Sequence, residues 1–386
     1  MKKSVWLFSL LALFAVQSGL CAAEEIPVKI GNPLLARYPT SGDPDNSRPR
    51  SIWDMHYFNR KIYLGNGDYW NNRGPVDLWT YNGTGSFVNE YTVAEEMVFD
   101  FFEYDHKLFI PGNDATEDWT FGNLYINDPY RVPDPGWKKL RTLPGALHSF
   151  DVALFKGNLY EEISTDGSTP NRTLVSTDMG ETWTTFLSEI SWYLVVFPDF
   201  MFIHMGDYYK KYDGTTLQTV TPNLFPGWTG TRSMDRRARF VDGVLYAPVV
   251  RHYMYERTPL FFLPASEVKN GGVATQVAKF ATDNVRDMVV RGTTCYVMTA
   301  AEIQKDVSYK GRIYSSTDLT NWTQVTEFTV PGLPYSFEIM NNKFYVGLGG
   351  RYEPSLMACV GPESGSVWEV TPPQPICSSV NWTRFF

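Results

Sequence analysis

The sequence is poor in the residues that build redox and metal centres. Its 386 residues include four cysteines and five histidines, and no two cysteines have the C-x-x-C spacing. Zinc sites of the cysteine–histidine type are therefore not expected. Cys295 is expected to be a buried strand residue, and a Cys359–Cys377 bridge is the pairing that an oxidising compartment would allow.

Long apolar runs are also missing, with one exception at the N-terminus. Lys2 and Lys3 precede an apolar run over 5–16, and small residues follow as far as Ala23. This pattern predicts a signal peptide over residues 1–23, and hence a periplasmic or secreted protein. A lipid anchor on Cys21 is the alternative, which Leu20 disfavours because a small residue is usual there. No later segment reaches the roughly 18–20 apolar residues of a membrane span, so no transmembrane segment is expected.

Basic charge is scarce. The chain has 34 Lys and Arg against 42 Asp and Glu, for a formal net charge of −8. Nucleic acid is therefore not expected as a partner, because phosphate binding depends on clustered Lys and Arg. The charge does not exclude a neutral or anionic glycan held by a local basic pocket. No segment shows a convincing helical period, which leaves an all-β fold.

What the sequence does contain is a repeated apolar–aromatic pair. The pairs recur about every 40–50 residues, each after an apolar run and a short turn. They are Ile62-Tyr63, Leu108-Phe109, Leu159-Tyr160, Met201-Phe202, Leu245-Tyr246, Cys295-Tyr296 and Phe344-Tyr345. Two further strands are expected after each pair. The third unit shows all four strands, at 148–155, 158–164, 172–176 and 182–187.

Four strands per unit, repeated seven times, predict an all-β chain folded as a seven-bladed β-propeller of four-stranded antiparallel blades. Six blades is the alternative, because the fourth unit is short. The propeller is expected over residues 48–371, with an N-terminal arm over 24–47 and a C-terminal tail over 372–386. One of these two arms is expected to close the ring. We expect a monomer.

A second pattern marks two of the turns. Residues 176–183, Ser-Thr-Asp-Met-Gly-Glu-Thr-Trp, match S-x-D-x-G-x-x-W at every defined position, and residues 316–322 are a shorter copy without the glycine. The aspartate can accept bonds from backbone N–H groups of a turn, and the tryptophan can pack between sheets. We therefore interpret both segments as architectural.

An Asp box within an exported, aromatic-rich propeller resembles the sialidase-like superfamily of Asp-box (BNR-repeat) proteins. The resemblance implies a β-propeller that acts on or binds carbohydrate, because members are sialidases, other glycoside hydrolases, polysaccharide lyases and non-catalytic binders. Sialidases carry an F/Y-R-I-P motif in the first blade, and its arginine grips the substrate carboxylate. The nearest segment here is Leu108-Phe109-Ile110-Pro111, which lacks the arginine and falls in the second blade. This departure counts against sialidase activity.

Strand order places the candidate binding residues at one end of the propeller. Strands alternate in direction, so the loops between second and third strands share an end with the crossings between blades, and the Asp-box turns lie at the other. These loops combine aromatic rings, which stack on sugars, with polar groups that bond hydroxyls. Ordinary solvated loops are the alternative. The candidates for substrate binding are Asp68, Trp70, Arg73, Asp118, Trp119, Arg251, His252, Tyr253 and Tyr309.

A further candidate site is the start of the innermost strand of each blade. Nine residues before the aromatic residue of each pair stand Asp54, Asp100, Asp151, Tyr193, Arg237, Asp287 and Ser336. Two interpretations stay open: the carboxylates either cap backbone groups at the blade entry or line the channel mouth as catalytic groups. The catalytic set would be these four aspartates together with His148, Arg237 and Arg286.

The sequence thus predicts an exported carbohydrate-interacting propeller, with a polysaccharide or glycan as partner. A glycan-cleaving enzyme would be a glycoside hydrolase with two carboxyls flanking the bond, or a polysaccharide lyase with a base such as His148 and an arginine against the sugar carboxylate. A non-catalytic glycan- or protein-binding propeller is the alternative. No cofactor is expected except Ca²⁺, which acidic loops could hold.

Overall fold

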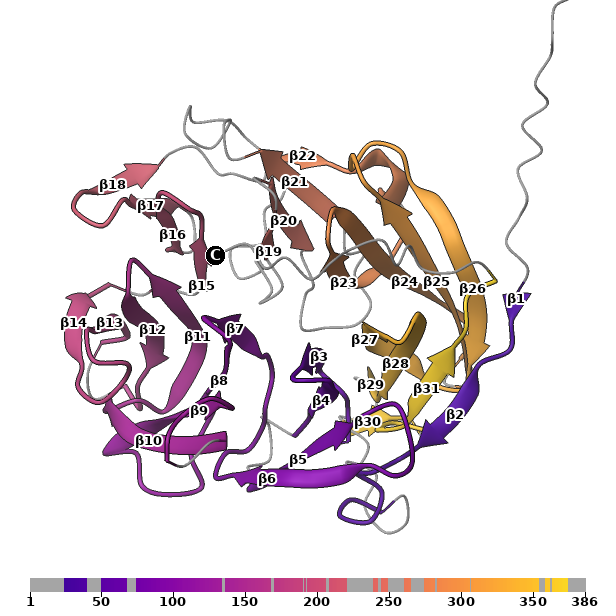
Figure 1. Cartoon of the computed structure of the whole chain (residues 1–386), viewed down its shortest axis with the longest axis horizontal. Coiled ribbons are helices and arrows are strands. Elements are labelled where there is room, and N and C mark those ends of the chain that lie inside the picture. The colour runs from indigo at the N-terminus through magenta and orange to yellow at the C-terminus, as the bar shows by residue number, and fades with distance from the viewer. Residues whose placement is uncertain are drawn as a thin grey trace, which may run out of the picture.

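The structure is a computed structural model of the whole chain (Figure 1). The described residues are 24–39, 50–67, 74–133, 136–167, 170–189, 191, 193–205, 208–220, 239–241, 244–248, 260–264, 274–281, 283–305, 307–353, 358–361 and 363–373. The predicted signal peptide and Cys377 lie outside these ranges, so the signal peptide and the disulfide remain predictions.

The described strands form six four-stranded sheets, one five-stranded sheet and a two-stranded hairpin, and a 3₁₀ turn at Ala278–Phe280 is the one helical element among them. The first three sheets contain β3 (Asp54–Phe58), β4 (Lys61–Gly65), β5 (Val76–Tyr81) and β6 (Val88–Val93); β7 (Phe102–Tyr104), β8 (Lys107–Pro111), β9 (Phe121–Asp128) and β10 (Gly136–Pro144); and β11 (His148–Phe155), β12 (Asn158–Ser164), β13 (Arg172–Ser176) and β14 (Thr184–Leu187).

The remaining sheets continue this order along the chain. They contain β15 (Tyr193–Val196), β16 (Met201–His204), β17 (Tyr209–Tyr212) and β18 (Leu217–Val220); β19 (Arg239–Val241), β20 (Val244–Pro248), β21 (Leu260–Pro264) and β22 (Thr275–Gln276); β23 (Val285–Arg291), β24 (Thr294–Gln304), β25 (Ser308–Ser316) and β26 (Thr323–Val330) with β1 (Glu24–Glu25); β27 (Leu333–Met340), β28 (Lys343–Gly349) and β31 (Val367–Val370) with β2 (Val28–Gly31); and the hairpin β29 (Arg351–Glu353) and β30 (Ala358–Val360).

The sheets are arranged around a common axis (Figure 1). The innermost strands are β3, β7, β11, β15, β19, β23 and β27. β27 contacts both β23 and β3, and β11 contacts both β7 and β15, so the inner strands follow one another around the axis. The N-terminal strand β2 pairs with β31 and supplies the outer strand of the sheet that holds the last strands of the chain. The N-terminal arm therefore joins the first and last parts of the chain, as the sequence analysis expects of one arm.

Apolar and aromatic side chains fill the spaces between neighbouring sheets. One cluster packs Phe109, Leu124 and Leu140 of β8–β10 against Val152 and Leu174 of the next sheet, and none of the five is more than 5% exposed. Full burial of one such side chain contributes about 1.5–3 kcal/mol. Packing between sheets is therefore where much of the aromatic and aliphatic content is used.

Both Asp-box segments fold as turns between the outer strands of a sheet. Asp178 accepts the backbone N–H four residues later at 2.9 Å, and Asp318 accepts the one three residues later at 2.7 Å. Met179 and Leu319 hold equivalent positions, with φ angles of 58° and 62°. The tryptophans that end the two boxes pack against clusters between the sheets. The shorter copy therefore forms a similar turn without the glycine.

Aspartates of the inner strands link neighbouring sheets. They accept a backbone N–H of the next inner segment, at 3.1 Å from Phe101 to Asp54, at 2.7 Å from Leu194 to Asp151 and at 2.8 Å from Phe337 to Asp287. Ser336 Oγ donates to the Ile52 carbonyl at 2.9 Å and so links the last sheet to the first. These three carboxylates therefore have the capping role, which is one of the two interpretations left open by the sequence.

The strand predictions for the third unit are confirmed, apart from one boundary. The first three strands have the predicted bounds, and the fourth begins at Thr184 rather than Thr182. Cys295 lies in β24 and is 1% exposed, as expected. Among the described residues, no helix has the length and apolar character needed to cross a membrane.

Loss of one inter-sheet cap should lower stability without changing the fold. In Asp54→Ala, the buried N–H of Phe101 loses its acceptor, and such an unsatisfied donor costs about 1–3 kcal/mol. We expect the free energy of unfolding, measured by urea denaturation, to fall by that amount. Glu181→Ala removes an exposed ion pair with Lys138 and should change it by no more than about 1 kcal/mol. Equal losses in the two variants would contradict the capping role.

Candidate functional site

Three chain segments converge at one end of the sheets. They are the crossing from β6 to β7, the loop from β8 to β9 and the start of β11. Glu95 pairs with Ala115, and Asn113 pairs with His148, as isolated antiparallel bridges. The backbone N–H of Glu96 donates to the Asn113 carbonyl at 3.3 Å. These pairings fix the positions of the polar side chains that the three segments carry.

Two carboxyl groups and an imidazole meet where the segments converge. One ligand atom each of Glu96, Asp114 and His148 lies within 4.8 Å of the other two. His148 Nε2 is 3.9 Å from Glu96 Oε1 and 4.0 Å from Asp114 Oδ2. The Glu96 side chain is 1% exposed, whereas those of Asp114 and His148 are 13% and 23% exposed. The cluster therefore opens to solvent on the side of Asp114 and His148.

Two hydrogen bonds orient this cluster from outside. Ser164 Oγ lies 3.1 Å from His148 Nδ1, which leaves Nε2 facing the two acidic side chains. The indole N–H of Trp119 donates to Asp114 Oδ1 at 3.1 Å, which leaves Oδ2 facing His148. Burial raises the pKa of Asp114, and the bond from Trp119 opposes this shift. Asp114 therefore keeps its proton to a higher pH than an exposed aspartate does.

A buried carboxyl group supports the cluster from the neighbouring position. Burial raises the pKa of Glu95 to about 7, against bonds from Asn123 and Tyr125 that lower it. Asn123 Nδ2 and the Tyr125 hydroxyl both donate to Glu95 Oε1, at 2.6 and 2.9 Å. These bonds attach the crossing segment, which also carries Glu96, to the face of β9.

The arrangement allows two kinds of chemistry. A histidine between two carboxyl groups can transfer protons to and from a bound substrate, because imidazole titrates near neutral pH. The same oxygen and nitrogen atoms are also ligands that divalent metal ions use in proteins. Either chemistry would occur at the end of the molecule where the sequence places the candidate loops.

Three of the predicted site residues lie in this region. His148 belongs to the cluster, and Trp119 donates to it and is 45% exposed. Asp118 lies at the surface beside them and pairs with Arg141 at 2.7 Å. A hydrogen bond with Thr120 and this pairing lower the pKa of Asp118 to about 2, so it is ionised at all physiological pH values.

Two other candidates belong to a different sheet. Arg286 is 3% exposed, donates to the Pro334 carbonyl at 3.3 Å and lies over the Tyr335 ring at 4.9 Å. Tyr309 is 4% exposed, and its hydroxyl donates to Glu302 at 3.2 Å. Both lie in the sheet that contains β23–β26, which is across the central axis from β11 (Figure 1). The structure therefore does not bring them to His148.

The remaining candidates divide into two groups. Asp100 is 2% exposed and lies on the same crossing segment as Glu96, and the other inner-strand aspartates are the caps described above. The candidates that lie outside the described residues are Asp68, Trp70, Arg73, Arg237, Arg251, His252 and Tyr253. For these seven, the sequence prediction stands untested.

Glu96 and Asp114 are the cluster members that are not among the residues predicted from the sequence. Asp114 lies in a loop that the sequence analysis selects, beside Asp118 and Trp119. Glu96 lies in the crossing between two sheets, which the strand order places at the same end as these loops. The two adjacent glutamates at 95–96 in that crossing are the sequence signal from which Glu96 could have been predicted.

Comparison with known proteins gives the following results. No protein-family model matches the sequence, and no curated protein matches it. Solved structures that are similar include a prolyl endopeptidase, at a TM-score of 0.46 and 10% identity over 88% of this chain and 53% of the other. They include the extracellular domain of a putative hybrid two-component system from B. thetaiotaomicron, with a TM-score of 0.49 and 9% identity over 90% of this chain and 42% of the other. They also include an ulvan lyase of polysaccharide lyase family PL25, with a TM-score of 0.47 and 11% identity over 90% of this chain and 95% of the other.

The chain spans about half the length of the first two of these proteins. All three TM-scores are below 0.5. These similarities therefore support no inference about activity.

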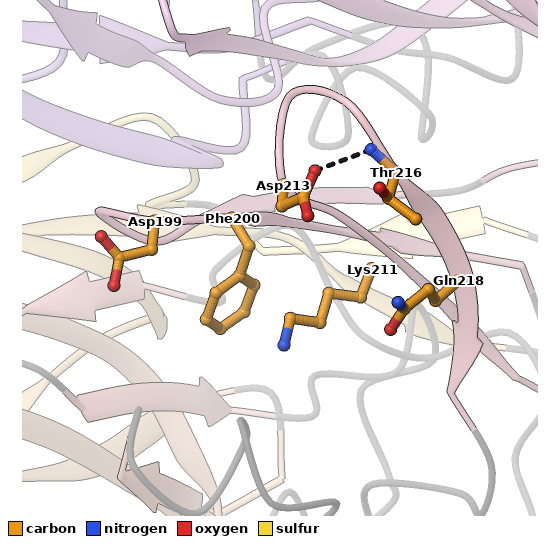
Figure 2. Close-up of a pocket in the computed structure, with 6 residues that line it drawn as sticks. All are labelled: Asp199, Phe200, Lys211, Asp213, Thr216 and Gln218. Atoms are coloured by element: carbon orange, nitrogen blue, oxygen red, sulfur yellow. Dashed lines mark hydrogen bonds between the residues drawn. The ribbon is translucent and has the colours of Figure 1, made fainter.

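A hollow at the opposite end of the sheets is a weaker candidate (Figure 2). It encloses about 190 Å³ and is lined by Asp199, Phe200, Lys211, Asp213, Thr216 and Gln218. Asp213 accepts the backbone N–H groups of two residues in its own turn, and Lys211 covers the Phe200 ring at 4.7 Å. These contacts are explained by the turn, so we assign no function to the hollow.

Two further glutamates are buried in β12, next to the strand that carries His148. Burial raises the pKa of Glu161 well above 4.5, and nearby Asp151 and Glu95 add to the shift against a bond from Ser149. Burial also raises the pKa of Glu162 well above 4.5, with Asp151 again adding to it. The folded chain therefore holds protons here that the unfolded chain releases.

The stability of the protein should fall as pH rises. Above about 4.5 the unfolded chain binds fewer protons than the folded chain, so the free energy of unfolding decreases by up to about 1.4 kcal/mol per pH unit for each group. The free energy of unfolding continues to decrease until the pH exceeds the pKa values that Glu161 and Glu162 have in the folded chain. Denaturation of Glu161→Gln/Glu162→Gln between pH 5 and pH 8 should show a smaller slope. Glu181→Gln, at the surface, should keep the original slope, and an unchanged slope in the double variant would contradict the assignment.

Proposed function

We propose that the chain is a seven-bladed β-propeller that belongs with the Asp-box proteins it resembles. Six four-stranded sheets and one five-stranded sheet around a common axis support this proposal. The two Asp-box turns support it as well, since both lie between the outer strands of a sheet. In this architecture, the loops and crossings at one end of the ring meet at a shared site.

The proposed function is cleavage of a polysaccharide outside the cytoplasm, at the end of the propeller where Glu96, Asp114 and His148 meet. The observation that carries the proposal is this meeting of one imidazole and two acidic side chains within 4.8 Å. Trp119 supports it, because an exposed ring bonded to Asp114 offers a sugar a stacking surface beside the reactive groups. Burial raises the pKa of Asp114, which is typical of groups that take part in proton transfer.

His148 should be required for cleavage. The mature protein would be incubated with neutral, sialylated and uronic-acid polysaccharides, and new reducing ends and unsaturated uronate absorbance would be followed. A hydrolase releases reducing ends alone, and a lyase releases both. We expect His148→Asn to lose about 100-fold or more in kcat/KM, which is the usual contribution of proton transfer.

His106→Asn is the matched control for this experiment. His106 lies on the β7–β8 turn with a φ of 58°, and asparagine tolerates this conformation. We expect its activity to equal that of the unchanged protein. Full activity in His148→Asn would overturn the proposed site. Retention of a polysaccharide without product from any of the substrates would show the non-catalytic alternative instead.

Trp119 should contribute to substrate binding through its ring. Trp119→Ala removes the stacking surface, and we expect KM to rise about 3- to 10-fold because such a ring contributes about 0.5–1.5 kcal/mol. Trp119→Phe keeps a ring and should recover most of this loss. Tyr130→Ala changes an exposed aromatic residue at the other end of the sheets and should leave KM unchanged. A similar effect of the Trp119 and Tyr130 variants would contradict the placement of the sugar.

A further inference from the structure

We infer that Glu96, Asp114 and His148 bind a divalent metal ion, with the side-chain oxygen of Asn113 as a fourth donor. The three side chains come from three separate segments, and one ligand atom of each lies within 4.8 Å of the other two. Two acidic side chains at this distance repel each other when both are ionised, and a cation between them removes the repulsion. The role of this metal in polysaccharide cleavage rests on the proposed function, but its binding does not.

Asn113 provides an independent indication of a ligand. The residue is 3% exposed, and its Oδ1 has no hydrogen-bond partner among the described residues. Such a buried acceptor is costly unless something binds it. Asn113 forms an antiparallel bridge with His148, and residues opposite each other in a bridge project to the same face. The side chains of Asn113 and His148 therefore project to the same side of the bridge, which is the side of the cluster.

The surrounding hydrogen bonds leave one ligand atom of each exposed member facing the centre. Ser164 Oγ pairs with His148 Nδ1 at 3.1 Å, so Nε2 is the nitrogen that faces the two acidic side chains. Trp119 binds Asp114 Oδ1 at 3.1 Å, so Oδ2 faces His148. Metal-bound imidazoles and carboxylates in proteins are oriented by outer hydrogen bonds of this kind.

The spacing of the ligand atoms is close to what an ion requires. Two ligands that share a tetrahedral zinc ion are roughly 3.4 Å apart. His148 Nε2 lies 3.9 Å from Glu96 Oε1 and 4.0 Å from Asp114 Oδ2. All three ligand atoms lie within 4.8 Å of one another, so small shifts of the three side chains would bring them to this spacing. The required movement is therefore one of side-chain position rather than of fold.

The donor atoms also indicate which metal would bind. Ca²⁺ takes oxygen ligands, whereas an imidazole nitrogen combined with carboxylate oxygens suits Zn²⁺ or Mn²⁺. This differs from the sequence expectation of Ca²⁺ in acidic loops, because the sequence does not show that His148 joins the two acidic side chains. Asp114 and His148 are the partly exposed members, so an ion with more than four coordination positions, such as Mn²⁺, would have one facing solvent that could take a sugar oxygen.

Metal binding would be measured on the mature protein without any polysaccharide. After treatment with EDTA and its removal, Zn²⁺, Mn²⁺ and Ca²⁺ would be titrated separately by calorimetry, with native mass spectrometry for stoichiometry. We expect one Zn²⁺ or Mn²⁺ per chain, bound at least about 10-fold more tightly than Ca²⁺, and a higher Tm with the metal. We expect His148→Asn and Glu96→Gln to weaken binding at least about 100-fold, and Trp119→Phe to weaken it about 10-fold through the lost bond to Asp114.

Control variants make the result specific to this cluster. His106→Asn should bind the metal as the unchanged protein does, and thermal melts of the apo variants would show that each is folded. Absence of stoichiometric binding, equal affinity in His148→Asn, or preferred binding of Ca²⁺ would each overturn the inference. Cleavage by the metal-free protein would refute a role of the metal in the reaction while leaving the proposed function intact. Metal binding without cleavage of any substrate would refute the proposed function and leave the inferred metal site intact.

Discussion

The fold depends on side-chain bonds that pass from inner strands, β3, β11, β23 and β27 among them, to the next sheet around the axis. A buried carboxylate accepts a backbone N–H from the neighbouring sheet at Asp54, Asp151 and Asp287, and Ser336 makes the last link by donating to the Ile52 carbonyl. A sheet in this arrangement is not covered by helices, so its inner edge must find partners in the adjacent sheet. At the outer edge of the last sheet, β2 pairs with β31 and so gives the backbone groups of β31 their partners.

One of these links lies beside two buried glutamates. Asp151 holds the next sheet through Leu194, and this fixed carboxylate lies near Glu161 and Glu162 in the same sheet. Both glutamates are fully buried, which makes their ionisation costly. The start of β11 therefore places His148 at the partly exposed end of a sheet that also contains two buried glutamates with raised pKa values. The site and the links between sheets share one short stretch of chain.

The candidate site combines residues with different degrees of exposure for a physical reason. Glu96 lies on the crossing segment between two sheets and its side chain is buried, whereas His148 at the start of β11 and Asp114 in the β8–β9 loop are partly exposed. Trp119 and Ser164 hold the two exposed members in place from outside. This division suits either proton transfer or metal binding at the same point.

The sequence by itself determined the local features of this protein. The apolar run, the apolar–aromatic pair and the short turns predicted the four strands of the third unit, except that the fourth begins at Thr184 rather than Thr182, because strands and tight turns are specified by residues close in the chain. The Asp-box pattern fixed two turns, since their bonds join residues close in the chain. Only the tertiary structure decided that three inner-strand aspartates cap the next sheet, and that Glu96 and Asp114 meet His148. Their partners lie tens of residues away, and their distances depend on how the sheets pack around the axis rather than on any local pattern.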